Sequence, residues 1–147
     1  MTTIRHSAEI DAPPDEVWRI VGDPRNLPQW NQHILAVHEV PPTGLVPGAK
    51  YWTEMGGFGI RFRILAEVVE LEPPTYSMIR LSGPVTATVR TWVHPASDGR
   101  TRLEHEVDYH VRGGPIGEII GRALRLLGAS RMLKRGLEAQ KRQVEGS

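Results

Sequence analysis

The chain of 147 residues contains no cysteine. Disulfide bonds, thiol nucleophiles and thiolate metal sites are therefore excluded. No apolar run reaches the roughly 18 residues that a membrane-spanning helix needs. The net charge of only +1 gives no global argument for binding to nucleic acid. Residues 1–3 lead directly into a strand pattern rather than a signal peptide, so we expect a cytoplasmic protein without a transmembrane segment.

The length and composition are typical of one globular domain. The sequence is 39% hydrophobic and 24% charged, and it shows no internal repeat, linker or low-complexity stretch. A chain of this length can bury one sizeable core. We therefore expect residues 1–147 to form a single domain whose core spans residues 3–144.

Alternating apolar and polar residues predict a series of strands separated by glycine and proline turns. The expected strands span residues 3–11, 34–40, 50–55, 59–71, 76–82, 85–93 and 101–111. Two short helices are expected at residues 15–21 and 26–32, where they can close one end of a curved sheet. No helix-length crossover joins the strands after residue 34, so they are predicted to form an antiparallel meander.

The last part of the chain, Pro115 to Val144, carries an apolar stripe at helical spacing. The register of the stripe shifts after Gly128, so we expect a long helix that bends there. Such a helix must bury its stripe, which predicts that it lies in the concave face of a curled sheet. Gly117, Gly121 and Gly128 lie on one edge of the stripe. Small residues there favour either a cavity or close packing of the helix on the sheet.

Several short motifs, in a fixed order, resemble a known family. They are IDAPPDEVW at residues 10–18, LPQW at 27–30, PG at 47–48, VELEPP at 69–74, GRTRL at 99–103 and GGP at 113–115. In this order they resemble the polyketide cyclase/dehydrase-like family of the helix-grip (SRPBCC) superfamily, shared with START lipid-transfer domains and the major birch-pollen allergen. The resemblance covers residues 3–144.

The resemblance implies an α+β helix-grip fold. In this fold a seven-stranded curved antiparallel sheet, two short helices and a long C-terminal helix enclose a cavity. The fold hosts cyclases, lipid carriers and hormone receptors, so the resemblance is stronger evidence for architecture than for function.

The last strand contains two candidate catalytic residues. His105 and Tyr109 share one face, while charged residues occupy the other, so both are predicted to point toward the helix. An imidazole can move a proton near neutral pH, and a phenol can hold an enolate or carbonyl oxygen. The alternative is that both are core residues with satisfied hydrogen bonds. Arg80 is a third candidate, for holding a carboxylate or enolate if its strand phase faces inward.

Further residues are expected to line the cavity or its mouth. They are Trp30, His33, Glu54, Phe58, Phe62, Met78, Thr91, Val107, Ile120 and Leu124. The phase of Glu54 and Met78 is ambiguous, as it is for Arg80. Counting across the turn at residues 97–99 pairs Thr91 with His105 and places Trp92 outside, although one residue of slip would reverse that placement.

The remaining patterns indicate no metal or cofactor. The six histidines show no His-x-x-x-His spacing, so a zinc site is not expected, and no cofactor is implied. The last helix is rich in Lys and Arg, which favours weak contact with an anionic membrane surface or an acidic ligand. The more common explanation is a solvated face with cations near the helix C-terminus. The oligomeric state, monomer or homodimer, is left open.

Taken together, the residues and the resemblance predict a protein that binds a hydrophobic, polyketide-like or lipid-like small molecule. As an enzyme it would catalyse aldol cyclisation and dehydration without a cofactor, with orientation of the chain supplying much of the rate. The first alternative is a non-catalytic carrier or sensor of such a ligand. The second is a filled core whose function lies in a protein partner.

Overall fold

The computed structural model describes every residue of the chain except 1, 43, 58, 112, 116, 120, 123–127 and 147. Within the described part, seven strands form one sheet. They are β1 (Thr2–Ile10), β2 (Ile34–His38), β3 (Lys50–Gly57), β4 (Ile60–Glu72), β5 (Tyr76–Ser82), β6 (Val85–Pro95) and β7 (Thr101–Val111). The named helical elements are α1 (Pro14–Val21), η1 (Pro24–Asn26), α2 (Leu27–Trp30), η2 (Ser97–Gly99) and α4 (Ala129–Glu145).

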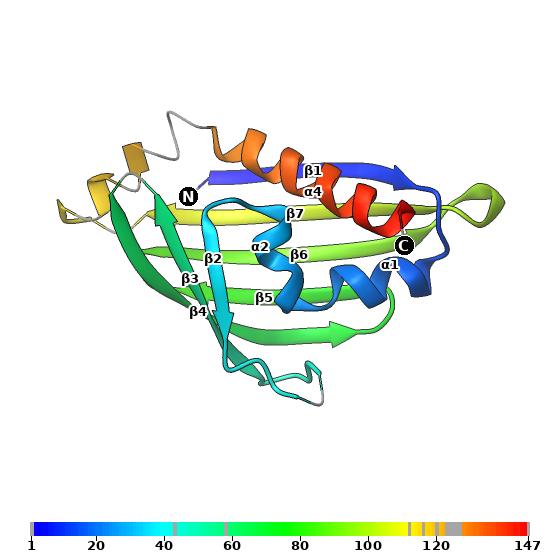
Figure 1. Cartoon of the computed structure of the whole chain (residues 1–147), viewed down its shortest axis with the longest axis horizontal. Coiled ribbons are helices and arrows are strands. Elements are labelled where there is room, and N and C mark those ends of the chain that lie inside the picture. The colour runs from blue at the N-terminus through cyan, green and yellow to red at the C-terminus, as the bar shows by residue number, and fades with distance from the viewer. Residues whose placement is uncertain are drawn as a thin grey trace.

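The sheet has the order β1-β7-β6-β5-β4-β3-β2, and every neighbouring pair is antiparallel. Strands β2 to β7 therefore form the predicted meander, and β1 joins it beside β7. Figure 1 shows the sheet curving around α4, with α1 near one end of the concave face and α2 over its middle beside β2. The predicted helix-grip arrangement of curved sheet, short helices and C-terminal helix is confirmed.

The register between β6 and β7 is also the predicted one. Thr91 lies opposite His105, and Trp92 lies opposite Glu104. The turn that sets this register contains Asp98 and Gly99, whose φ angles of 61° and 71° lie in the left-handed region. Two consecutive left-handed residues reverse the chain in a short connection, so no residue of slip is introduced.

The predicted single helix over Pro115–Val144, bent at Gly128, is wrong. Residues 115, 117–119 and 121–122 are helical, but Gly128 has φ 73° and ψ 99°, and α4 begins only at Ala129. A helix cannot continue through a left-handed residue, whereas glycine adopts that conformation without the clash of a Cβ. The chain is thus free to change direction before α4, and Gly117 and Gly121 are both buried in the earlier segment.

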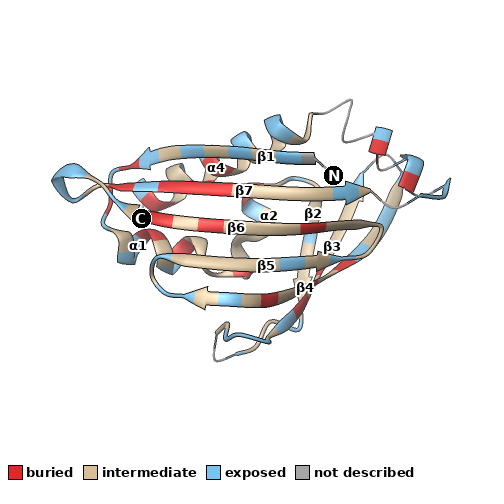
Figure 2. Ribbon diagram, turned by 180° about the vertical axis from the view of Figure 1, so that it is seen from behind, coloured by how far each residue is buried: buried red, intermediate tan, exposed pale blue. Residues whose placement is uncertain are grey.

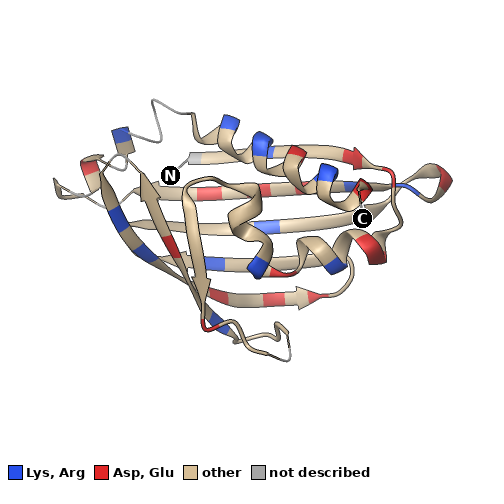
Figure 3. Ribbon diagram, in the orientation of Figure 1, with Lys and Arg blue, Asp and Glu red and all other residues tan. Residues whose placement is uncertain are grey.

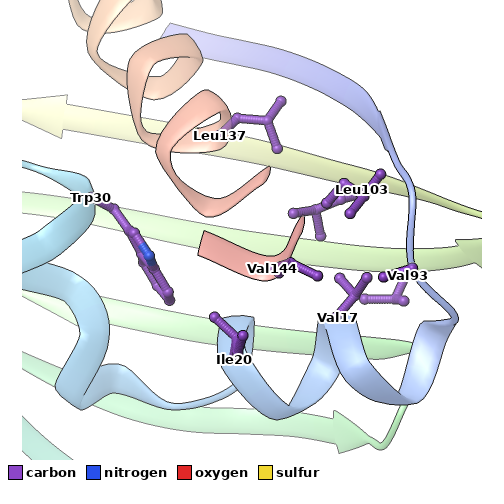
Figure 4. Packing of buried hydrophobic residues seen from close by; sticks show 9 residues of the cluster. Val17, Ile20, Trp30, Val93, Leu103, Leu137 and Val144 are labelled. Carbon is purple, nitrogen blue, oxygen red and sulfur yellow. The ribbon is translucent and has the colours of Figure 1, made fainter. Parts of the chain in front are cut away.

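The hydrophobic core lies where α1, α2 and the second half of α4 meet the sheet (Figure 4). Its buried residues are Ile10, Ala12, Val17, Ile20, Trp30, Val93, Leu103, Leu137 and Val144. Full burial of an aliphatic side chain of this size contributes about 1.5–3 kcal/mol. The end of α4 is also held by Glu145, which accepts hydrogen bonds from the Asp11 backbone N–H at 2.8 Å and from Lys141 at 2.9 Å.

Candidate ligand-binding site

The two faces of the sheet differ sharply in chemistry. On the outer face, Arg90 pairs with Asp108 at 3.1 Å and Arg102 with Glu104 at 3.0 Å. Trp92 also lies on this face, where its ring sits 5.5 Å from the Arg5 guanidinium. These ion pairs therefore belong to the convex surface, away from α4. Figure 3 shows where acidic and basic residues occur along the strands of the sheet.

Arg80 and Met78 lie on this outer face. The strand phase that the sequence left open is therefore the one that removes both residues from the expected site. Met78 lies opposite Arg90 in the β5–β6 pair. Tyr76, two residues earlier on β5 and so on the same face, lies opposite Trp92. The Arg80 side chain is 54% exposed and its guanidinium lies 3.7 Å from the Glu67 carboxylate. An arginine in this position cannot reach a ligand held between sheet and helix.

Glu54 is also on the outer face, contrary to its predicted placement. Its carboxylate lies 3.3 Å from the His38 ring and 3.7 Å from the Arg63 guanidinium. The opposite phase of β3 faces inward instead, because Thr53 pairs with the buried Ile64. Side chains of successive strand residues point to opposite faces, so one inward residue fixes the rest.

The structure brings together five of the predicted residues on the concave face. They are Phe62, Thr91, His105, Val107 and Tyr109. His105 and Thr91 are buried there, while Phe62, Val107 and Tyr109 are half-buried. The predicted orientation of these five is confirmed, and their part in binding or catalysis remains a prediction.

Trp30 and His33 do not form one group with those five. Trp30 is only 8% exposed and belongs to the core, where its indole N–H donates to Gln143 Oε1 at 2.7 Å. It therefore ties α2 to α4. The half-buried His33 ring has Nδ1 at 3.3 Å from the Gly56 carbonyl oxygen. Phe58, Ile120 and Leu124 lie outside the described residues.

His105 is held at both of its ring nitrogens. Nε2 lies 2.7 Å from Gln140 Oε1, and Nδ1 lies 2.9 Å from Thr91 Oγ1. An amide oxygen only accepts, so in this arrangement Nε2 carries the hydrogen and the Thr91 hydroxyl donates to Nδ1. Burial lowers the pKa of His105, which favours the neutral ring. To act on a ligand, His105 would have to give up one of these two bonds.

Burial changes along the concave face from one end to the other. On β7 the inward residues Thr101, Leu103 and His105 are buried, whereas Val107 and Tyr109 are half-buried. The neighbouring strands are mixed at the second end: on β6, Val85 and Val89 are half-buried but Ala87 between them is buried. On β3 and β4 the inward residues level with Val107, Tyr109 and Val111 are buried, namely Tyr51, Thr53, Ile64, Ala66 and Val68. Figure 2 shows the buried stretches of β6 and β7 at the end that carries α1. On β6 and β7 the other end thus presents apolar side chains that the protein itself covers only in part.

Two inward hydroxyl groups on β3 were not predicted. Tyr51 is 5% exposed and Thr53 is 6% exposed, and both are on the concave face opposite Ala66 and Ile64. Neither hydroxyl forms a hydrogen bond with a described residue. Both hydroxyl oxygens keep some contact with solvent, unlike the Arg100 Nε, which is buried without a partner. The Tyr51 phenol is a donor at neutral pH, and burial raises its pKa further. The alternation of residues 50–55 predicts that Tyr51 and Thr53 share one face of the strand. The sequence did not show that this face, rather than the face of Trp52 and Glu54, points inward.

The concave face carries no charged side chain among the strand residues that the structure describes. The inward positions of β7 are Thr101, Leu103, His105, Val107, Tyr109 and Val111, and those of β4 from residue 60 to 68 are all apolar. Nor do three or more described His, Asp or Glu side chains gather as metal ligands would. This face can bind apolar surface and a few hydrogen-bonding groups.

This architecture, a curved antiparallel sheet gripping a C-terminal helix over an apolar concave face, defines a helix-grip protein. The chain belongs to the family described as polyketide cyclase / dehydrase and lipid transport, whose model matches residues 1–145. Two sequences of uncharacterized proteins from two Mycobacterium tuberculosis strains are each 31% identical over 111 residues, or 75% of this chain. The chain spans about half of the length of these relatives, 49% in each case.

Solved structures with the same fold include an enzyme and a START protein. The Zhui aromatase/cyclase from Streptomyces sp. R1128 superposes with a TM-score of 0.78 at 16% identity, covering 98% of this chain and 93% of its own. A START superfamily protein from Mycobacterium smegmatis gives a TM-score of 0.74 at 17% identity, covering 98% and 97%. At these identities the likeness establishes the fold alone. None of the described helices has the length and apolar character that crossing a bilayer requires.

Proposed function

We propose that the protein binds a hydrophobic small molecule between the concave face of its sheet and its C-terminal helical region. The observation that carries this proposal is the half-buried apolar surface at one end of that face. Its residues include Ile79, Val85, Val89, Val107 and Phe62. Each square ångström of apolar surface removed from water contributes about 25 cal/mol, so a ligand that covers these side chains gains affinity from them.

Binding ranks above catalysis in this proposal. Of the three candidate catalytic residues, Arg80 faces away from the concave side, and both His105 nitrogens have protein partners. A carrier or sensor needs neither group to be free. The family description names lipid transport beside polyketide cyclase / dehydrase, so it is compatible with a carrier.

Ring closure by aldol condensation is the second candidate. It is supported by the shared inward face of His105 and Tyr109 and by the aromatase/cyclase of the same fold. In that role the phenol would hold the carbonyl oxygen while the imidazole moved the proton. Orientation of the bound chain would supply much of the rate.

Binding is tested with N-phenylnaphthylamine (NPN), a neutral probe whose fluorescence rises when it leaves water. We expect saturable binding by the wild type. We expect at least a tenfold loss of affinity in Val89→Trp, which adds an indole to the half-buried inward surface. The matched control is Thr88→Trp, one residue away on the outer face, which should bind as the wild type does. If the wild type does not bind NPN, or if both variants lose affinity equally, the proposal is wrong.

Catalysis is tested separately with a linear poly-β-ketone. If the protein is an enzyme, His105→Gln and Tyr109→Phe should abolish turnover and keep NPN affinity. The exposed His110→Gln serves as the control with unchanged turnover. A wild type that binds the polyketone and never converts it supports the carrier and rules out the cyclase.

A further inference from the structure

We propose that the ligand is an uncharged molecule with a hydrogen-bonding oxygen, such as a ketone, and that the hydroxyls of Tyr51 and Thr53 hold this oxygen. This inference rests on the proposed function, because it names the class of ligand for the same concave face. It adds two positioning residues on β3 and excludes fatty acids, phosphates and other anions.

The hydroxyls of Tyr51 and Thr53 lie on the concave face without a protein partner among the described residues. Tyr51 and Thr53 are two residues apart on one strand, so they project from the same face about 7 Å apart along β3. Both residues are at least nine-tenths buried. A hydroxyl that still reaches solvent can bond to water, and a ligand oxygen can take the place of that water.

The contrast with the other polar side chains of this face strengthens the argument. His105 is satisfied at both nitrogens by Thr91 and Gln140, so this group needs no ligand to complete it. The phenol of Tyr51 is a donor at neutral pH, as any tyrosine is, and burial raises its pKa further above that range. Donors without a protein partner indicate that the ligand contributes an acceptor, as a carbonyl or ether oxygen does.

The described strands place no positively charged side chain on the concave face, and the Lys and Arg residues that the chain carries after residue 128 lie on α4 instead. The guanidinium of Arg80 lies on the far side of the sheet. An anion moved onto this face would lose its hydration without gaining a counter-charge from the strands. Two hydroxyl donors compensate for an uncharged oxygen but not for a full negative charge.

The charge preference is tested with two probes of one aromatic framework. NPN is neutral, and anilinonaphthalene sulfonate (ANS) carries a sulfonate on the same framework. We expect NPN to bind at least tenfold more tightly than ANS. Equal affinities, or tighter binding of ANS, would overturn the neutral-ligand inference and leave the proposed function standing. Failure of both probes would overturn the proposed function itself.

The oxygen anchor is tested with prodan, a neutral naphthyl ketone whose emission shifts to the red when its carbonyl accepts a hydrogen bond. In Tyr51→Phe we expect bound prodan to emit further to the blue and to dissociate at about fivefold higher concentration, the loss of one neutral hydrogen bond. Thr53→Val should act in the same direction. Binding of NPN, which has no carbonyl, should stay within twofold of the wild type in both variants.

The matched control is Tyr76→Phe, which removes a phenol from the outer face, where Tyr76 lies 5.7 Å from Trp92. It should leave both the emission and the affinity of prodan unchanged. Unchanged emission and affinity in both Tyr51→Phe and Thr53→Val, with NPN still bound, would refute the anchor. Equal loss of NPN and prodan would also refute it, because that outcome indicates a general effect on the fold.

Discussion

Both ends of the concave face carry apolar side chains, but other parts of the chain cover these side chains to different extents. On β7, Leu103 and Val107 are both apolar and share one face, yet Leu103 is fully buried and Val107 is half-buried. The difference comes from what covers them, since α1, α2 and the second half of α4 pack at the Leu103 end. On β7, the Leu103 end stabilises the fold, whereas the Val107 end belongs to the ligand surface that we propose.

The largest expected effect is a difference in stability between these ends. Leu103→Ala should lower the free energy of unfolding by about 3 kcal/mol, because it creates a cavity in a packed core. Val107→Ala should cost about 1 kcal/mol or less, because that side chain already has space on one side. Urea titrations measure both values. Equal losses would contradict the division of the face into a packed and an open end.

A smaller effect is expected from the bond between α2 and α4. Trp30→Phe keeps the aromatic packing but removes the indole N–H that donates to Gln143. The Gln143 oxygen would then lack its partner, at a cost of about 1–3 kcal/mol. Thermal unfolding of Trp30→Phe and of the double variant Trp30→Phe/Gln143→Leu checks this. The double variant should recover part of the loss, and no recovery would argue that the bond does not carry the effect.

The buried histidine predicts a pH dependence of similar size. Burial lowers the pKa of His105 below its ordinary value of 6.5. The unfolded chain therefore binds a proton more readily than the folded one, and stability must fall as the pH drops below about 6.5. We expect the wild type to lose about 1 kcal/mol between pH 7 and pH 5.5 relative to His105→Gln. The variant His110→Gln should keep the wild-type slope, and identical slopes for all three would refute the assignment to His105.

The smallest effect is expected on the outer face. Arg80→Ala removes an exposed ion pair with Glu67, so stability should change by no more than about 0.5 kcal/mol. NPN affinity should not change, because the side chain lies on the opposite face from the proposed site. A tenfold change in NPN affinity would place Arg80 in the binding site after all.

The sequence predicted the β6–β7 pair to the residue. Charged side chains alternate with apolar ones through β7, which leaves only one face for the core. The turn at Ser97–Gly99 has a length that fixes the register. The meander of β2 to β7 followed from the absence of helix-length crossovers between strands. The family followed from short motifs in a fixed order.

The phases of β3 and β5 could not be read in the same way. The outer face of this sheet has aromatic contacts of its own, since Tyr76 and Trp92 lie side by side there with Arg5 over the indole. Tyr76 and Met78 therefore look like core residues in sequence but pack outside. The break at Gly128 was hidden for another reason, because an apolar stripe persists across a glycine whatever its φ angle.

The most direct test of the central claim is an NMR titration of the wild-type protein with NPN. We predict that chemical shifts change at Val85, Val89, Val107 and Phe62, the half-buried inward residues, while those of Leu103 and Val93 stay within error. Shift changes confined to the outer face, or largest at Leu103 and Val93, would contradict the account.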